Sequence, residues 1–144
     1  MSPYHKNETN LLDMKVNLKI KLSALWVTLM FFYLYRDVLG FMEPGHVEEL
    51  ITGELGGVQM TSAILLGSAI LMAIPSVMVF LSLTLKAPVN RWVNIILGIL
   101  HLVLLGSTLC VGAISTLYIF YVIVEAVLIA LIVWTAWKWP KQQV

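Results

Sequence analysis

The sequence contains few charged residues. Of its 144 residues, 12% are charged and 60% are hydrophobic. Soluble domains carry about 25% charged residues and about 45–50% apolar ones. A soluble protein of this size has too little interior to hide so much apolar surface. The composition therefore excludes an ordinary soluble domain and predicts a membrane protein whose partner is the lipid bilayer.

Several chemical motifs are also absent. A single cysteine, Cys110, excludes an intrachain disulfide and a CxxC redox centre. The sequence has no glycine-rich phosphate loop, no HExxH motif and no nucleophile elbow. A haem would lack paired axial ligands, because His5 and His46 fall outside the apolar segments. We expect no metal site and no nucleic-acid partner, and the sequence leaves the cofactor unknown.

Four apolar segments are long enough to cross a bilayer. A spanning helix needs about 20 mostly apolar residues, and helices satisfy the backbone in lipid. The segments cover residues 20–39, 58–85, 92–109 and 115–137. They predict an all-α membrane protein, an up-down bundle of four transmembrane helices. The predicted domains are a tail at 1–18, the transmembrane domain at 19–139 and a tail at 140–144.

The start of the chain and the second segment each carry a further signal. The first 18 residues are polar, and the apolar stretch after them is too long for a signal peptide, so we expect the first span to be retained. Pro75 lies within the second segment and removes one backbone hydrogen bond. We expect this helix to bend there.

The basic residues predict the orientation. Eight of the nine fall on one side of the predicted spans, namely Lys6, Lys15, Lys19, Lys21, Lys86, Arg91, Lys138 and Lys141. Only Arg36 falls on the other side, where we expect its long side chain to extend to the interface. Positive-inside bias therefore places both termini in the cytoplasm.

The first outer loop has apolar residues at helical spacing. Val47, Leu50 and Ile51 follow Pro44-Gly45 and precede Gly53. This pattern predicts a short amphipathic helix lying over the outer end of the bundle. Its glutamates and His46 could hold a divalent cation, but a solvated acidic face is the favoured interpretation.

Two ionisable residues lie deep in the predicted spans. One is Glu125: a carboxylate near the middle of a span is costly, by about 2.5–3.5 kcal/mol on insertion scales for Asp, and rarely faces lipid. We expect it to point into the bundle, hydrogen-bonded or protonated, as a proton carrier, a ligand anchor or a polar clamp between helices. Folding the last two spans into a hairpin places His101 at the same depth. We therefore predict that His101 pairs with Glu125.

Polar residues form stripes on three of the spans. At about 100° per residue, one stripe of the third span holds Asn94, Gly98, His101, Leu105, Thr108 and Gly112. Tyr118, Tyr121 and Glu125 share a face of the fourth span, and Ser23, Trp26, Met30, Tyr33 and Asp37 share one of the first. The predicted ligand-binding residues are Glu125, His101, Tyr121, Tyr118, Tyr33 and Asp37. The alternative is that these groups only join the helices.

Several stretches resemble a known family. They read KIKLSALWV, MAIPSVMVFLSL, VNRWVNIILG and LIVWTAWKWP. From about Lys15 onward the chain resembles a family of small four-span bacterial membrane proteins, a domain of unknown function. The resemblance implies a bacterial plasma (inner) membrane protein and places Glu125 where the family has a glutamate. It assigns no catalytic residue.

Three functions are compatible with this pattern. The leading hypothesis is binding or transport of a small apolar or cationic molecule in an outward-facing intramembrane cavity, with Glu125 as its polar anchor. An alternative is an intramembrane enzyme that modifies a lipid or quinone and uses His101 and Glu125 as an acid–base pair. Another is an interaction subunit without chemistry of its own, in a homo-oligomer or a membrane complex.

Overall fold

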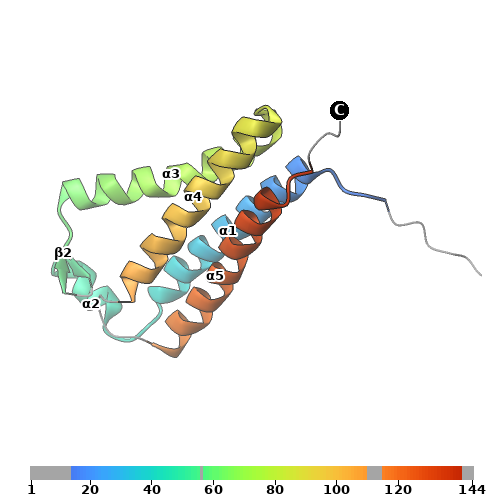
Figure 1. Cartoon of the computed structure of the whole chain (residues 1–144). Coiled ribbons are helices and arrows are strands. Elements are labelled where there is room, and N and C mark those ends of the chain that lie inside the picture. Colours follow the sequence, from blue (N-terminus) through green and yellow to red (C-terminus); the bar gives the residue numbers. More distant parts are fainter. Residues whose placement is uncertain (1–13, 56, 110–114, 141–144) are drawn as a thin grey trace, which may run out of the picture.

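The computed structural model describes residues 14–55, 57–109 and 115–140 (Figure 1). Four of the described helices are long and apolar enough to cross a membrane. They are α1 (Leu18–Gly40), α3 (Ser62–Thr84), α4 (Ala87–Thr108) and α5 (Thr116–Trp137). The predicted all-α class with four long apolar helices is confirmed. The chain is a multi-pass membrane protein.

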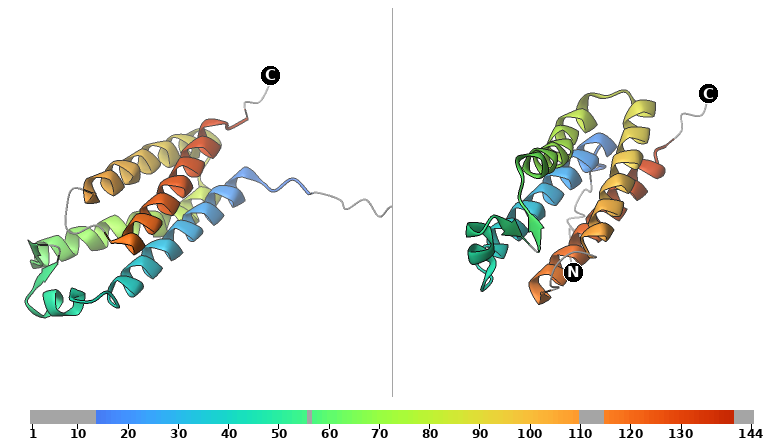
Figure 2. Two further views of the ribbon diagram at one scale, coloured as in Figure 1. Left: turned by 90° about the horizontal axis from the view of Figure 1, so that it is seen from below. Right: turned by 90° about the vertical axis from the view of Figure 1, so that its left-hand side faces the viewer.

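Helix α1 is the central element of the bundle. It packs against α3 on one side and α5 on the other, and α5 also packs against α4 (Figures 1 and 2). Helices α3 and α4 approach each other mainly where Leu85-Lys86 connects them. Hereafter the end with this connection, Leu18 and Trp137 is the termini face. The end with residues 41–61 is the loop face.

Local signals set the helix starts. The side chains of Asn17, Thr61 and Ser115 each accept a hydrogen bond from a backbone N–H of the first turn. Helix α4 begins at Ala87, earlier than the predicted start near residue 92, because Pro88 fits the first helical turn. Helix α3 begins at Ser62, later than the predicted residue 58.

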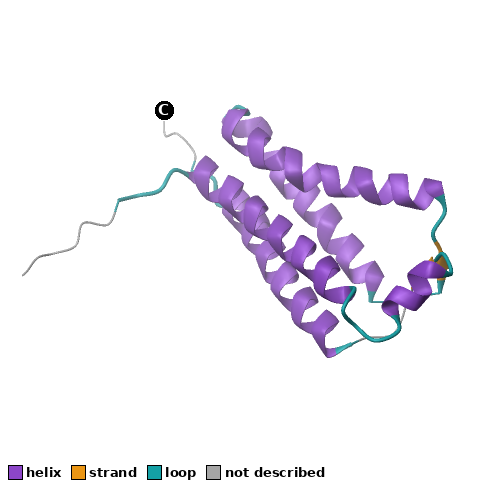
Figure 3. Cartoon of the chain, turned by 180° about the vertical axis from the view of Figure 1, so that it is seen from behind, coloured by secondary structure: helices purple, strands orange, loops and turns teal. Residues whose placement is uncertain are grey.

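The loop face contains a short helix and a small hairpin (Figure 3). Helix α2 spans His46–Ile51, and β1 (Glu54–Leu55) pairs antiparallel with β2 (Val58–Gln59). The hairpin was not predicted, and it is the reason that α3 starts late. Gly57, in the turn between the strands, has φ +79°, a conformation that glycine adopts without steric cost.

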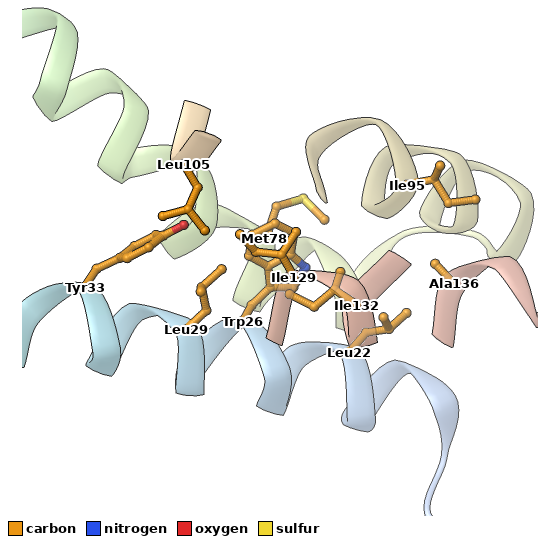
Figure 4. Close-up of a cluster of buried hydrophobic side chains, with 10 residues drawn as sticks. All are labelled: Leu22, Trp26, Leu29, Tyr33, Met78, Ile95, Leu105, Ile129, Ile132 and Ala136. Carbon is orange, nitrogen blue, oxygen red and sulfur yellow. The ribbon is translucent and has the colours of Figure 1, made fainter. Parts of the chain in front are cut away.

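The interior is built mainly from α1 and α5. Helix α1 contributes Leu22, Trp26, Leu29 and Tyr33, whose spacing of three and four residues puts them on one helix face. The remaining members of the cluster in Figure 4 are Met78, Ile95, Leu105, Ile129, Ile132 and Ala136. The buried residues of α4 include Asn94, Gly98, His101 and Leu105. The predicted stripe of the third span therefore faces the interior, except that Thr108 is exposed and Gly112 lies outside the described residues.

One part of α3 stands apart from the bundle. Every residue from 61 to 70 is exposed. Figures 1 and 3 show this part of the helix diverging from α1 and α4 toward the loop face. Pro75 is the first buried residue of α3. The bend expected at Pro75 stays a prediction.

Candidate functional site

The carboxylate of Glu125 is the deepest charged group of the bundle. The residue is 0% exposed, so it faces the interior as predicted. Its partner is Arg36 of α1, whose Nη1 donates a hydrogen bond to Oε2 at 2.8 Å. The Arg36 side chain is 20% exposed, and its Nε lies 3.6 Å from Oδ1 of Asp37. The ion pair therefore links the interior of the bundle to its loop face.

The second carboxylate oxygen of Glu125 is free. Oε1 is buried and has no hydrogen-bond partner among the described residues. Most buried polar atoms in proteins are satisfied, and a polar atom left unpaired in a low-dielectric interior is costly. Glu125 can therefore accept one further hydrogen bond without giving up Arg36.

His101 does not pair with Glu125. Its Nδ1 lies 2.8 Å from the carbonyl oxygen of Leu97, one turn earlier on α4, and donates to it because a carbonyl oxygen only accepts. Its ring lies edge-on to Trp26 at 5.7 Å and stacked on Tyr33 at 6.4 Å. The predicted contact between His101 and Glu125 is wrong.

The physical reason is the position of α1. Equal depth on a hairpin fixes height in the membrane but not which neighbour a side chain meets. Helix α1 packs against α5 and brings the guanidinium of Arg36 to Glu125. A guanidinium compensates a buried carboxylate better than a neutral imidazole does, because the hydrogen bond is charge-assisted. Arg36 does not simply extend to the interface, as the sequence had suggested.

A cavity of about 670 Å³ lies at the loop face. This volume is within the range of about 300–1,000 Å³ that is usual for small-molecule sites. Its walls come from the end of α1, from α2, from the hairpin and from the first turns of α3 and α5. The polar lining residues are Arg36, Asp37, Glu43, His46 and Tyr118. The larger apolar ones are Phe41, Leu50, Leu55, Met60, Leu65 and Leu117.

The predicted site residues fall into two layers. Asp37 and Tyr118 line the cavity, and the Tyr118 hydroxyl donates to Oγ1 of Thr108. Tyr33, Tyr121, His101 and Glu125 are buried and do not line it. The two layers are joined through a residue outside the predicted set, since Arg36 lines the cavity, contacts Glu125 and lies 5.4 Å from the centre of the Tyr33 ring.

Three of the polar lining residues, Arg36, Glu43 and His46, were missed from the sequence. Arg36 could have been found from its position, because it is the one basic residue on its side and lies nearly three helical turns from Trp26. Glu43 and His46 carried no signal beyond their place in an acidic loop. Among the described residues, no three His, Cys, Asp or Glu side chains form a group that could hold a metal ion.

A separate polar network lies toward the termini face. Nε1 of Trp26 donates to Oδ1 of Asn94 at 2.7 Å. Nδ2 of Asn94 donates to Asn90, whose own Nδ2 donates to the carbonyl oxygen of Ser82 at 2.6 Å. All four residues are 0% exposed. These groups satisfy one another and join α1, α3 and α4, so this network serves packing.

Comparison with protein-family models finds a match over most of the chain. A model described as a family of unknown function (DUF6326) matches residues 9–144. No curated protein and no solved structure matches the chain.

Proposed function

Because the chain belongs to the family of unknown function DUF6326, we propose a function on the basis of its own site. The protein binds a small apolar or cationic molecule in the loop-face cavity, or carries it across the bilayer. The observation that carries this proposal is the position of Arg36. Its guanidinium lines the cavity and forms an ion pair with the buried carboxylate of Glu125.

The lining suits an amphipathic molecule. The apolar side chains can cover a hydrophobic body, and a few polar groups fix its orientation. Asp37 and Glu43 supply two carboxylates against one guanidinium, so the wall favours a positive charge on the ligand. Glu125 strengthens this preference, because it compensates the one fixed cation of the wall.

Glu125 thus acts on the cavity through Arg36. It does not line the cavity, so the sequence-based view of it as a direct anchor changes to that of a positioning residue. Its free Oε1 supports a further role: a donor that reaches the ion pair can bind there without displacing Arg36. The intramembrane enzyme lacks such support, since it needed an acid–base contact between His101 and Glu125.

We further infer that the loop face is extracytoplasmic, with both termini in the cytoplasm of a bacterial cell. The support is the distribution of basic residues, which favours retention of the termini face in the cytoplasm. In this orientation the cavity is outward-facing in the plasma membrane.

The test uses two ions of matched size and opposite charge. Tetraphenylphosphonium and tetraphenylborate are titrated into the purified protein in uncharged detergent, with binding followed by calorimetry. We expect the cation to bind at least about tenfold more tightly, a difference of about 1.4 kcal/mol. Equal affinity for the two ions, or no binding of either, would contradict the proposal.

Variants locate the site. Asp37→Asn removes one lining carboxylate and is expected to weaken cation binding about fivefold, an effect of about 1 kcal/mol. Glu48→Gln is the matched control, because Glu48 is exposed on α2 and does not line the cavity. An equal loss in both variants would mean that the cation binds the acidic loop diffusely.

A further inference from the structure

An arginine on the termini face holds a charge that its surroundings do not compensate. Arg91 lies in the first turns of α4, and its guanidinium carbon lies 5.7 Å from the ring centre of Trp92 and 5.8 Å from that of Trp137 on α5. Its Nε is buried and has no hydrogen-bond partner among the described residues. The guanidinium therefore lies beside two aromatic rings, and its Nε has an unused hydrogen to donate.

No carboxylate of the described chain reaches it. The acidic residues in the described ranges are Asp37, Glu43, Glu48, Glu49, Glu54 and Glu125. Five of them lie toward the loop face, in the second half of α1 or in residues 41–61. The sixth, Glu125, is bound to Arg36. The ion pairs of Arg36 with Glu125 and with Asp37 both lie toward the loop face, away from Arg91. An anion that binds Arg91 would therefore come from outside the described part of the chain.

A second cation and more aromatic surface lie on the same face. Nζ of Lys138 lies 4.1 Å from the ring centre of Trp134, one turn before Trp137 on α5. Trp92, Trp134 and Trp137 are more than half exposed, at 55%, 58% and 59%. Large aromatic side chains that are exposed at the end of a spanning helix lie at the level of the lipid headgroups. We call these five residues the Arg91 cluster.

We propose that the Arg91 cluster binds the phosphate of an anionic phospholipid. Arg91 donates hydrogen bonds to the phosphate oxygens, a geometry that its planar fork favours. Lys138 supplies a second positive charge, and the exposed tryptophans cover the glycerol and the upper acyl chains. Basic pockets between helix ends recognise anionic headgroups in this way.

The geometry favours a lipid over a soluble anion. Trp92 and Trp137 beside the guanidinium, and Trp134 beside Lys138, present exposed apolar surface, and only a ligand with an apolar part gains from covering it. The two ring contacts also restrain Arg91 before a ligand arrives, so less side-chain freedom is lost on binding. By contrast, Nζ of Lys19 already donates to the carbonyl oxygens of Leu83 and Leu85, so this lysine caps the C-terminal end of α3.

The proposal is tested by lipid binding to the purified full-length chain. Native mass spectrometry measures the retention of phosphatidylglycerol and of phosphatidylcholine with identical acyl chains. We expect phosphatidylglycerol to be preferred, and Arg91→Gln to lower this preference about fivefold. Arg91→Lys keeps the charge but loses the fork, so it should keep only part of the preference. Lys86→Gln is the matched control, because it removes an exposed cation of the same face outside the cluster.

A second measurement does not depend on any variant. Bilayers with brominated acyl chains quench tryptophan fluorescence, and brominated phosphatidylglycerol should quench the wild-type chain at a lower mole fraction than brominated phosphatidylcholine. Equal quenching by both lipids would overturn the proposal. An equal loss of the phosphatidylglycerol preference in Lys86→Gln and Arg91→Gln would also overturn it, because the attraction would then be diffuse. Displacement of the lipid by inorganic phosphate would do the same, because the site would then take a soluble anion.

Discussion

Arg36 of α1 and Glu125 of α5 are 89 residues apart in the sequence and form a hydrogen-bonded ion pair of 2.8 Å. The carboxylate is fully buried, whereas the guanidinium reaches the loop-face cavity. The pair therefore joins the first and last spans of the bundle and places a fixed positive charge in the cavity wall, compensated from inside.

Breaking this pair on one side should destabilise the bundle more than removing both charges. Arg36→Gln leaves a buried carboxylate without a counter-charge, and such losses cost about 3–5 kcal/mol. The double variant Arg36→Gln with Glu125→Gln should be milder than the sum of the single ones. Unfolding in detergent gives the four free energies of the cycle. A coupling within about 0.3–0.5 kcal/mol of zero would show that the two residues act independently. Asp37→Asn is the control, and we expect a change below about 1 kcal/mol because Asp37 is solvent-exposed.

Gly98 should not tolerate a side chain. A Cβ built there lies 2.6 Å from Cγ2 of Val133 on α5, which is too close for both groups to keep their positions. We expect Gly98→Ala to destabilise the bundle by about 1–3 kcal/mol through overpacking. Val133→Ala in the same chain should restore much of the loss. Gly106→Ala on the same helix is the matched control, since nothing lies within 4 Å of its Cβ position. Equal effects at the two glycines would refute the close approach of α4 and α5.

The hydrogen bond between Trp26 and Asn94 should contribute measurably to stability. Trp26→Phe removes the indole donor, and Asn94→Leu removes the acceptor. Coupling energies between side chains in membrane proteins average about 0.6 kcal/mol and reach about 1.7 kcal/mol. Because both residues are fully buried, we expect a coupling energy above the average, between about 0.6 and 1.7 kcal/mol. It is measured by a double-mutant cycle of unfolding in detergent. Trp134→Phe, on an exposed residue, controls for the loss of indole surface. A coupling near zero would assign the stability to packing alone.

Reporter fusions test the orientation. A reporter after Gly45 should read as extracytoplasmic, and reporters after Lys86 and Val144 should read as cytoplasmic, because the basic residues concentrate on the termini side. Opposite readings at all three positions would invert the bundle and turn the cavity inward. Mixed readings would show that the chain inserts in both orientations.

The sequence predicts the helices and their buried faces well. Four apolar segments, the inward stripe through Asn94 and His101, and the burial of Glu125 all follow from hydropathy and helical periodicity. These signals are local, because each depends on residues within one helix. The hairpin at Glu54–Gln59 escapes them, since strands of two residues are too short to show alternation.

The partner of Glu125 could not be read from the sequence. A short connection makes α4 and α5 neighbours, and this drew attention to His101. Nothing comparable identifies the neighbour of α1, because its connection to α3 is long and leaves the packing order open. Arg36 meets Glu125 only because α1 lies between α3 and α5. The cavity depends on the same order, since its wall includes residues from α1, α3 and α5.

We expect the exposed first part of α3, residues 62–70, to make the cavity responsive to the thickness of the bilayer. A helix held by its neighbours takes its tilt from them, whereas a segment surrounded by lipid adjusts its tilt to match the hydrocarbon depth. Leu65 belongs to this segment and also forms part of the cavity wall. Thinner lipids should therefore tilt the segment and move Leu65 relative to Leu117 across the cavity. For the ligand binding proposed above, the acyl-chain length of the host membrane would then become a determinant of affinity.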